Sequence, residues 1–268
     1  MRHASLIAAA ALACAPAMAL AESSWDGLRA ELYGDRAIEA AVVSLQAPLR
    51  ATDDRAVPIS VSAALPDGRT VRSVTVVIDE NPMPVSAVVE MHRPMAHVAF
   101  DFTMRLNGPS PVHVVVEADD GRLYMAEQMV KTSGLGACAA PPVTDDAMAL
   151  ETLGRMELAA ADPAAVAVSR LRAAGADGRA RLTVSHPQHS GMQMDQITLL
   201  YRPARFIETL EVWAGEAPLF TLTGSISLSE NPEIGFDRPA GADGSAPLRV
   251  RMTDTDGAVF ERRFGLES

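Results

Sequence analysis

Apolar and polar side chains alternate along successive short segments of this chain, and no other feature of the sequence restricts its fold so strongly. Residues 57–63 show the pattern most clearly, with apolar side chains at Val57, Ile59, Val61 and Ala63. A period of two is that of a β-strand, because successive side chains point to opposite faces. The same pattern is expected at residues 71–79, 85–91, 96–106, 111–117 and 122–130. Short strands separated by turns at this spacing predict an antiparallel β-sandwich.

A second set of expected strands occupies the C-terminal part of the chain, at residues 179–184, 196–200, 205–214, 219–222, 246–253 and 259–264. The apolar content of 48% is enough for a real core, and the length suits two domains of about 100 residues better than one. A short helix is expected after Ser24, up to Gly34, and a weaker one within residues 145–161. We therefore predict an all-β fold of two antiparallel β-sandwiches, over residues 22–131 and 163–268, with a short N-terminal helix.

The first 21 residues have the pattern of a secretory signal peptide. Arg2 gives a weakly basic start, residues 4–20 contain one polar side chain, and Ala-Leu-Ala at 19–21 offers a cleavage site. A membrane anchor is the weaker interpretation, because the run is only just long enough and is rich in alanine. A lipoprotein site at Cys14 is a further alternative, opposed by the apolar sequence that continues beyond it. We expect cleavage after residue 21 and a periplasmic mature protein with no membrane span.

Cleavage would remove Cys14 and leave Cys138 as the one cysteine of the mature chain. A lone thiol in an oxidising compartment is buried and inert, paired with another molecule, or retained for its chemistry. Gly134 and Gly136 precede Cys138 and leave the backbone free, while two prolines follow it. Because neighbours this small cannot bury a side chain, we expect residues 132–162 to form a flexible linker that exposes Cys138 to other proteins. The alternative is an incidental linker cysteine.

Catalysis by the protein itself is not expected. A cysteine nucleophile needs a base and an orienting group, and no His or Asn stands close to Cys138 in the sequence. A carrier thiol needs only a partner's active site that favours the thiolate. The net charge of −11 argues against nucleic acid as a partner. No phosphate loop, nucleophile elbow or dinucleotide fingerprint occurs, so no cofactor is expected.

Two groups of residues could suggest a metal. His186 and His189 with Asp195 have the spacing of one helical turn, but Pro187 marks a loop and no further ligands stand nearby in the sequence. Met91, His92, Met95 and His97 form the one candidate copper cluster, and we interpret them instead as core and loop residues. No metal site is therefore predicted.

Several longer segments resemble a known family. The first half is similar to SoxY, the sulfur-carrying subunit of periplasmic thiosulfate oxidation, through VPISV at 57–61, IDENPMP at 78–84 and ADDGRLYMA at 118–126. The second half resembles SoxZ, its partner subunit, through SHPQHSG at 185–191, ARFI at 204–207 and GSISLSENP at 224–232. A single chain with both halves looks like the fused SoxYZ-like carriers associated with quinoprotein dehydrogenases.

The resemblance implies two immunoglobulin-like sandwiches and a cysteine to which substrate is covalently attached and passed between enzymes. Its partners would be periplasmic redox or sulfur-oxidation enzymes, including a quinoprotein dehydrogenase system. The chain departs from SoxY in one place: the family's Gly-Gly-Cys-Gly-Gly tail ends the chain, whereas Cys138 is followed by two alanines and a second domain. We expect a covalent thiol carrier working through Cys138. The alternatives are a non-catalytic binding or assembly module for a periplasmic dehydrogenase, and a thiol-dependent hydrolase or transferase.

Overall fold

The computed structural model describes residues 24–160, 176–195, 197–239 and 246–265, so the expected signal peptide lies outside the described residues. The chain divides into two units, residues 1–35 and 36–268. In the first unit, helix α1 spans Ser24–Tyr33, and the rings of Trp25 and Tyr33 lie 6.5 Å apart between centroids. Gly34 ends the helix with a φ of 59° and donates its N–H to the carbonyl of Ala30, because glycine adopts this left-handed conformation at little cost. No described helix is both long enough and apolar enough to cross a membrane.

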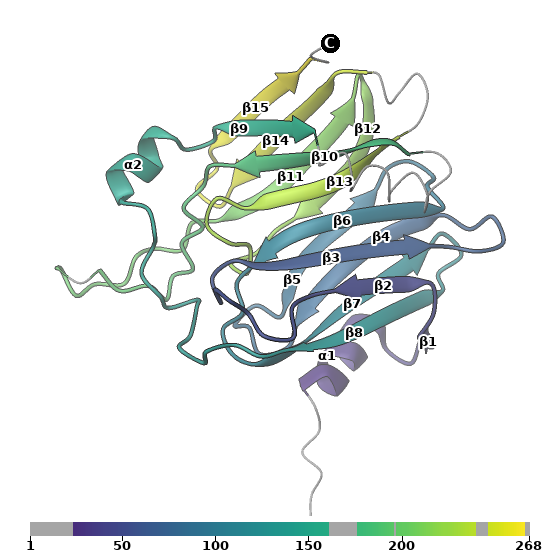
Figure 1. Ribbon diagram of the computed structural model, residues 1–268, viewed down its shortest axis with the longest axis horizontal. Coiled ribbons are helices and arrows are strands. Elements are labelled where there is room, and N and C mark those ends of the chain that lie inside the picture. Colours follow the sequence, from purple (N-terminus) through teal and green to yellow (C-terminus); the bar gives the residue numbers. More distant parts are fainter. Residues whose placement is uncertain (1–23, 161–175, 196, 240–245, 266–268) are drawn as a thin grey trace, which may run out of the picture. The chain divides into compact units, whose positions relative to one another are not determined.

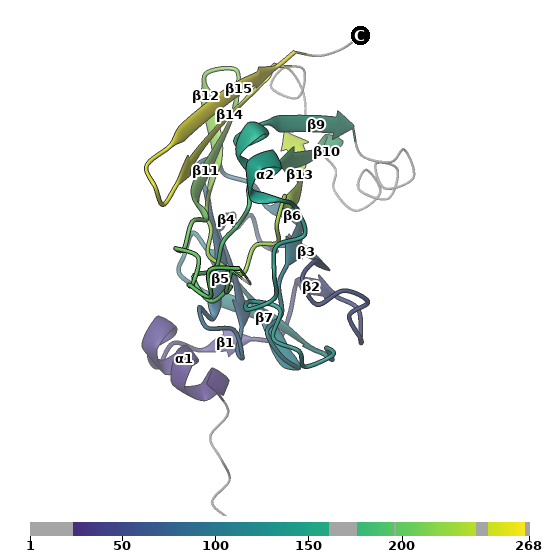
Figure 2. The same cartoon turned by 90° about the vertical axis from the view of Figure 1, so that its left-hand side faces the viewer.

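The second unit consists of two β-sheets packed face to face, which Figure 2 shows as two layers seen edge on. The nine-stranded sheet has the spatial order β1 (Ile38–Glu39), β8 (Leu123–Val130), β7 (Ser110–Ala118), β4 (Val71–Ile78), β5 (Val85–Met91), β12 (Ala217–Thr223), β11 (Ile207–Ala214), β14 (Leu248–Asp254) and β15 (Val259–Phe264). The six-stranded sheet has the order β2 (Val43–Gln46), β3 (Val57–Ala64), β6 (His97–Met104), β13 (Glu233–Pro239), β10 (Ala176–Val184) and β9 (Met156–Ala160) (Figure 1). Apart from the short β1–β8 pair, the strand pairs are antiparallel.

Both sheets run without interruption from the first half of the chain into the second. Strand β5 pairs with β12 in one sheet, and β6 pairs with β13 in the other. Between the layers, the buried ring of Phe220 packs edge-on against Phe100 and Phe236, with centroids 5.3 and 5.1 Å apart. The two sandwiches therefore share one core and two continuous sheets, and the linker is not what holds them together.

The apolar positions that alternate along the predicted strands are the positions that are buried in the structure. In β3, Val57, Ile59 and Val61 are at most 2% exposed, while Pro58 and Ser60 point outward. Burial of large aliphatic and aromatic side chains at this level is the main favourable contribution to folding. The prediction of an all-β fold of antiparallel sandwiches with a short N-terminal helix is confirmed.

Two local predictions are wrong. Residues 197–200 do not form a strand; they make a turn in which Leu199 has a φ of 57°, a left-handed conformation that no strand contains. The helix expected within residues 145–161 is limited to α2, Asp146–Glu151. It cannot continue because Gly154 has a φ of 77° and lies so close to Phe260 that a Cβ there would approach the ring to 2.0 Å. The chain then enters β9, which pairs with β10 inside the region expected to be a linker.

Candidate thiol site

Cys138 lies in the segment between β8 and α2 and is buried, with 0% of its surface exposed. The expectation of an exposed cysteine is therefore wrong. Its small neighbours in sequence do not bury it; residues far away along the chain do. Predicting burial from adjacent residues failed because the covering groups come from the loop after β6 and from the second half of the molecule.

Three side chains hold the backbone around Cys138. The N–H of Cys138 donates to Oδ1 of Asn107 at 3.3 Å, and its carbonyl accepts a hydrogen bond from the hydroxyl of Ser190. Two residues further on, the carbonyl of Ala140 accepts from Nε2 of Gln193 at 3.1 Å. Asn107 belongs to the first half of the chain, and Ser190 and Gln193 belong to the second. Both halves thus contribute to holding the cysteine in place.

The two glycines before the cysteine have left-handed backbone conformations, with φ of 77° at Gly134 and 75° at Gly136. A side chain at either position would strain the backbone. The carbonyl of Gly136 accepts the N–H of Ala139 at 3.0 Å, which closes a turn around Cys138. The glycines therefore shape the bend that directs the cysteine inward.

A buried arginine lies close enough to the thiol for their charges to interact. Arg105 is 2% exposed, and its Nη1 donates to the backbone carbonyls of Gln188 and Ile226, the latter at 3.4 Å. Its position is fixed by Asn81, whose Nδ2 donates to the Arg105 carbonyl at 2.7 Å and whose Oδ1 accepts from the N–H of Asn107 at 2.8 Å. Asn81 thereby holds both the arginine and the residue that binds the cysteine backbone.

The thiol and the guanidinium influence each other's ionisation. Burial raises the pKa of Cys138, because desolvation disfavours the thiolate, and the charge of Arg105 acts in the opposite direction. Burial also lowers the pKa of Arg105, against the opposing effect of the Cys138 thiolate and of Glu230. In this closed arrangement Cys138 is a protonated, weakly nucleophilic thiol with a positive charge close by.

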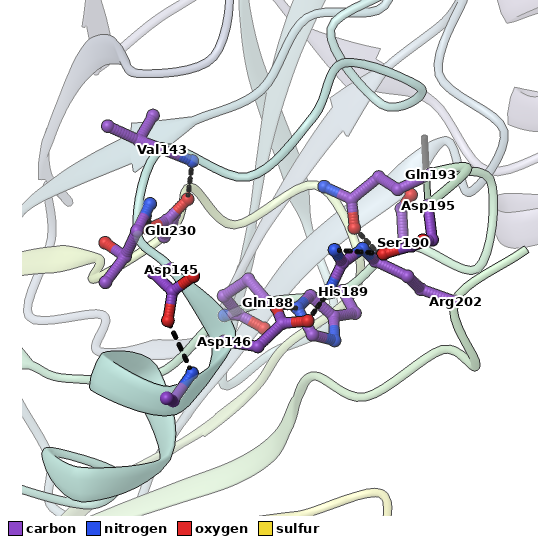
Figure 3. A network of polar contacts seen from close by, with 12 residues as sticks. Val143, Asp145, Asp146, Gln188, His189, Ser190, Gln193, Asp195, Arg202 and Glu230 are labelled. Atoms are coloured by element: carbon purple, nitrogen blue, oxygen red, sulfur yellow. Dashed lines mark hydrogen bonds and ion pairs between the residues drawn. The ribbon is translucent and has the colours of Figure 1, made fainter. Parts of the chain in front are cut away.

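A cavity of about 190 Å³ is lined by Ala137 and Ala140, which flank Cys138 in the sequence, and by Arg55, Arg105, Gln193 and Glu230, among others. The carboxylate of Glu230 accepts the N–H groups of Val143 and Thr144 at 2.8 and 2.9 Å, and Figure 3 shows the first of these contacts. Arg55 pairs with Asp53 at 2.9 Å. The cavity therefore contains charged groups of both signs.

A polar network covers the start of α2. Asp145 caps the helix by accepting the N–H of Ala147 at 2.9 Å. Arg202 pairs with Asp146 and, at 3.1 Å, with Asp195, and the ring of His189 lies 3.8 Å from Asp146 (Figure 3). Since Asp195 and Arg202 flank the 197–200 turn, this network ties the turn to the segment that follows Cys138.

The histidines whose spacing could suggest a metal site have other partners. Nδ1 of His186 accepts the N–H of Gln188 at 3.1 Å, and its Nε2 lies 3.5 Å from Asp254. Burial lowers the pKa of His186 to about 4, so the ring is neutral at pH 7. His92 contacts Thr221 at 2.8 Å. Among the residues that the structure describes, no three His, Cys, Asp or Glu side chains form a group that could hold a metal.

Sequence reasoning missed most of the residues around Cys138. Asn81, Ser190 and Glu230 fall within the segments that resemble the family, but nothing in the sequence assigns them a role. Arg105 stands at the end of an expected strand and has the appearance of an ordinary surface charge. A charged residue next to buried strand positions is only a weak indication that the charge itself is buried, because side chains at strand ends usually reach solvent.

Comparison with known proteins gives two family matches. The family model of the sulfur oxidation protein SoxY matches residues 29–138, ending on the cysteine, and that of the sulphur oxidation protein SoxZ matches residues 167–264. A search of curated proteins gave no match.

Among solved structures, the sulfur carrier protein SoxY from Chlorobium limicola f thiosulfatophilum is 26% identical, with a TM-score of 0.34, covering 41% of this chain and 97% of its own. A superoxide reductase (neelaredoxin) from Ignicoccus hospitalis is 16% identical with a TM-score of 0.28, covering 35% of this chain and 81% of its own. A putative superoxide reductase from Thermotoga maritima is 17% identical with a TM-score of 0.29, covering 35% of this chain and 88% of its own.

Proposed function

We propose that this chain, which belongs to the SoxY and SoxZ families of sulfur oxidation proteins and joins both in one polypeptide, is a covalent carrier of sulfur on Cys138. One observation carries the proposal: the SoxY match ends on Cys138, whose backbone is hydrogen-bonded by Asn107 from the first half and by Ser190 from the second. The thiol is the group that would bear the cargo. Donor and acceptor enzymes would supply the catalysis.

The chemistry of such a carrier requires a partner. Joining Sγ of Cys138 to the outer sulfur of thiosulfate forms a sulfur–sulfur bond and removes two electrons from the pair, while the thiol proton leaves to solvent or to a base. An oxidoreductase that accepts two electrons must therefore act with the protein. We propose that the partners are sulfur-oxidation or redox enzymes, including a quinoprotein dehydrogenase system, and that they meet this protein in the periplasm.

A carrier must also expose its thiol, and the structure holds Cys138 closed. Opening requires breaking the hydrogen bonds that the segment makes with Asn107, Ser190 and Gln193. Each contributes a net of about 0.5–1.5 kcal/mol, so the open form costs a few kcal/mol and is a minor population of about 0.1–10%. The binding free energy of a docking partner is enough to offset a cost of this size. The closed form would protect the thiol or its adduct between partners.

The test is intact-mass analysis of the protein purified from its native host. We expect a reducible mass increase that maps to Cys138 and is lacking in Cys138→Ser. Retention of full biological activity by Cys138→Ser would contradict the proposal. It would favour the second candidate, a non-catalytic binding or assembly module, which the complete burial of the thiol supports.

The periplasmic location has a separate test. Sequencing the N-terminus of the mature protein should give Glu22 or a residue close to it, because the sequence before it has the features of a cleaved signal. Cell fractionation should place the protein with periplasmic markers. A cytoplasmic protein that begins at Met1 would contradict this location and the oxidising environment on which the thiol argument depends.

A further inference from the structure

We propose that an exposed apolar hairpin in the second half of the chain is the surface on which a partner enzyme docks, and that the partner offers an apolar groove bordered by basic side chains. This apolar hairpin comprises residues 192–195 and 197–201. The inference rests on the carrier function proposed above. It adds the place and the chemistry of partner recognition.

The apolar hairpin presents large side chains to solvent. Those that are more than one-third exposed are Met192, Met194, Ile197, Leu199, Leu200 and Tyr201. Ile197 is 93% exposed, and in Figure 1 the hairpin projects in green from the left-hand side of the two sheets. Single exposed apolar side chains are ordinary on a protein surface, whereas a contiguous group of them marks an interaction site.

Hydrogen bonds fix the shape of the hairpin. The carboxylate of Asp195 accepts the N–H groups of Ile197 and Thr198 at 3.0 and 2.8 Å. The N–H of Asp195 donates to the carbonyl of Leu200 at 2.9 Å and closes the turn. The apolar side chains are therefore presented on an ordered backbone, so that a partner loses less free energy in ordering them on binding.

The charges beside the hairpin indicate the kind of partner. Helix α2 adjoins the hairpin, because its Asp146 pairs with Arg202 at the hairpin's base. Residues 139–154 contain three carboxylates and no lysine or arginine. Two of these carboxylates, those of Asp145 and Glu151, belong to exposed residues. An apolar surface with an acidic border is complementary to an apolar groove with a basic rim.

The same charges disfavour two other occupants of this surface. A second copy of the chain would bring one acidic border against another, and each copy has a net charge of −11. An anionic lipid surface would be repelled for the same reason. A protein with a basic rim complements both the apolar part and the acidic part of the surface.

The apolar hairpin also belongs to the loop that encloses the thiol. Ser190 lies just before it and holds the carbonyl of Cys138. Gln193 lies on its first arm and holds the carbonyl of Ala140, while its own carbonyl accepts the N–H of Arg202 at 2.8 Å. A partner bound to the hairpin is therefore in contact with the loop whose side chains keep Cys138 buried.

The first test measures loading of the thiol by the enzymes of the native host. The reduced mature protein is incubated with periplasmic extract and thiosulfate, and intact-mass analysis gives the initial rate at which Cys138 gains a reducible adduct. The double variant Ile197→Ser, Leu200→Ser should be loaded at least about tenfold more slowly, because a few central anchors carry most of the binding free energy. Its urea midpoint should match that of the parent, which excludes misfolding as the cause.

Leu49→Ser is the matched control for this test. Leu49 is 76% exposed in the connection between β2 and β3, so its replacement also removes a large apolar side chain from the surface. It should be loaded at the rate of the parent.

The second test detects the contact itself and does not depend on the cargo. Ile197→p-benzoylphenylalanine, illuminated in the same extract, should cross-link to one discrete partner, and Leu49→p-benzoylphenylalanine should not. Adding Asp145→Lys and Glu151→Lys should reduce the cross-linking yield at least about fivefold, because the partner's basic rim is then repelled. This dependence on charge distinguishes the partner from incidental capture of a sticky surface.

Equal loading of the double variant and the parent overturns the inference. A missing cross-link at Ile197, a cross-link to a second copy of the chain, and a yield that the charge reversals leave unchanged each overturn it as well. Binding to phosphatidylglycerol vesicles that is lost in Ile197→Ser would assign the hairpin to a membrane instead. If the parent is not loaded while Ile197 still gives the charge-dependent cross-link, the carrier function fails and the docking surface stands.

Discussion

The hydroxyl of Ser190 donates a hydrogen bond to the backbone carbonyl of Cys138, although the two residues are 52 positions apart in the sequence. The SoxZ half of the molecule thereby holds the cysteine that ends the SoxY half. The same hydroxyl accepts the N–H of Met192 at 3.1 Å, which fixes the loop that contains it. This contact is a restraint on release of the thiol.

Ser190→Ala should make Cys138 react faster. Loss of this hydrogen bond favours the open form by about 0.5–1.5 kcal/mol, so the rate with a neutral disulfide reagent should rise about two- to tenfold. Thiol modification followed by mass spectrometry measures it. Ser44→Ala, on the exposed edge of β2, is the control and should react like the parent. An unchanged rate for Ser190→Ala would mean that this contact does not restrain the cysteine.

The loss of folding stability at acid pH should depend on His186. Burial lowers its pKa to about 4 from an ordinary 6.5, so below pH 6.5 the unfolded chain takes up a proton that the folded chain refuses. Stability is therefore lost as pH falls from 6.5 to 4, by about 3 kcal/mol. Urea unfolding at pH 7.0, 5.5 and 4.5 should show this loss in the parent and a smaller loss in His186→Gln. Parallel pH profiles for the two proteins would contradict the assignment.

Gly154→Ala should destabilise the fold by about 2–4 kcal/mol, because it combines a left-handed backbone with overpacking against Phe260. Urea unfolding measures the change. Gly108→Ala is a suitable control, since a Cβ there meets nothing within 4 Å, and its effect should stay within about 0.5 kcal/mol. Adding Phe260→Ala should remove part of the Gly154→Ala penalty, as expected for residues in direct contact.

Phe236→Ala should unfold both halves together. Phe236 is 1% exposed and packs at the junction of the two sandwiches, and its truncation should cost about 3–5 kcal/mol. In a Trp25→Phe background, fluorescence of Trp213 reports the second half, and hydrogen exchange of β7 reports the first. Their urea midpoints should coincide in the parent and shift together in the variant. Separate transitions would show that the halves are independent despite their shared sheets.

The sequence predicts the strands of the first half well, because their hydrophobic alternation is a local property. Val57, Ile59 and Val61 indicate their burial without reference to any partner. Strand β9 was missed because residues 156–160 fall within the helix expected at 145–161, and their strand character comes from pairing with β10. Periodicity cannot reveal pairings of this kind.

The candidate site was predictable in its central residue and not in its surroundings. A lone cysteine beside two glycines stands out in any sequence. Its burial depends on Ser190 and Gln193, which are 52 residues from Cys138 and 53 from Ala140 respectively. Arg105 also gives no local sign of being buried, since its environment is created by the carbonyls of Gln188 and Ile226 from the other half.

The continuous sheets have a consequence for how the protein is made. Where β5 meets β12 and β6 meets β13, each half on its own would present two open strand edges, and open edges recruit other strands during synthesis. Two separate chains would have to associate before those edges paired with strands of other proteins. The rate of that association would depend on the concentrations of the two chains. Tethering makes that encounter intramolecular and fixes the ratio of the halves at one to one. Joining the two halves in one chain therefore favours their correct pairing at the β5–β12 and β6–β13 junctions.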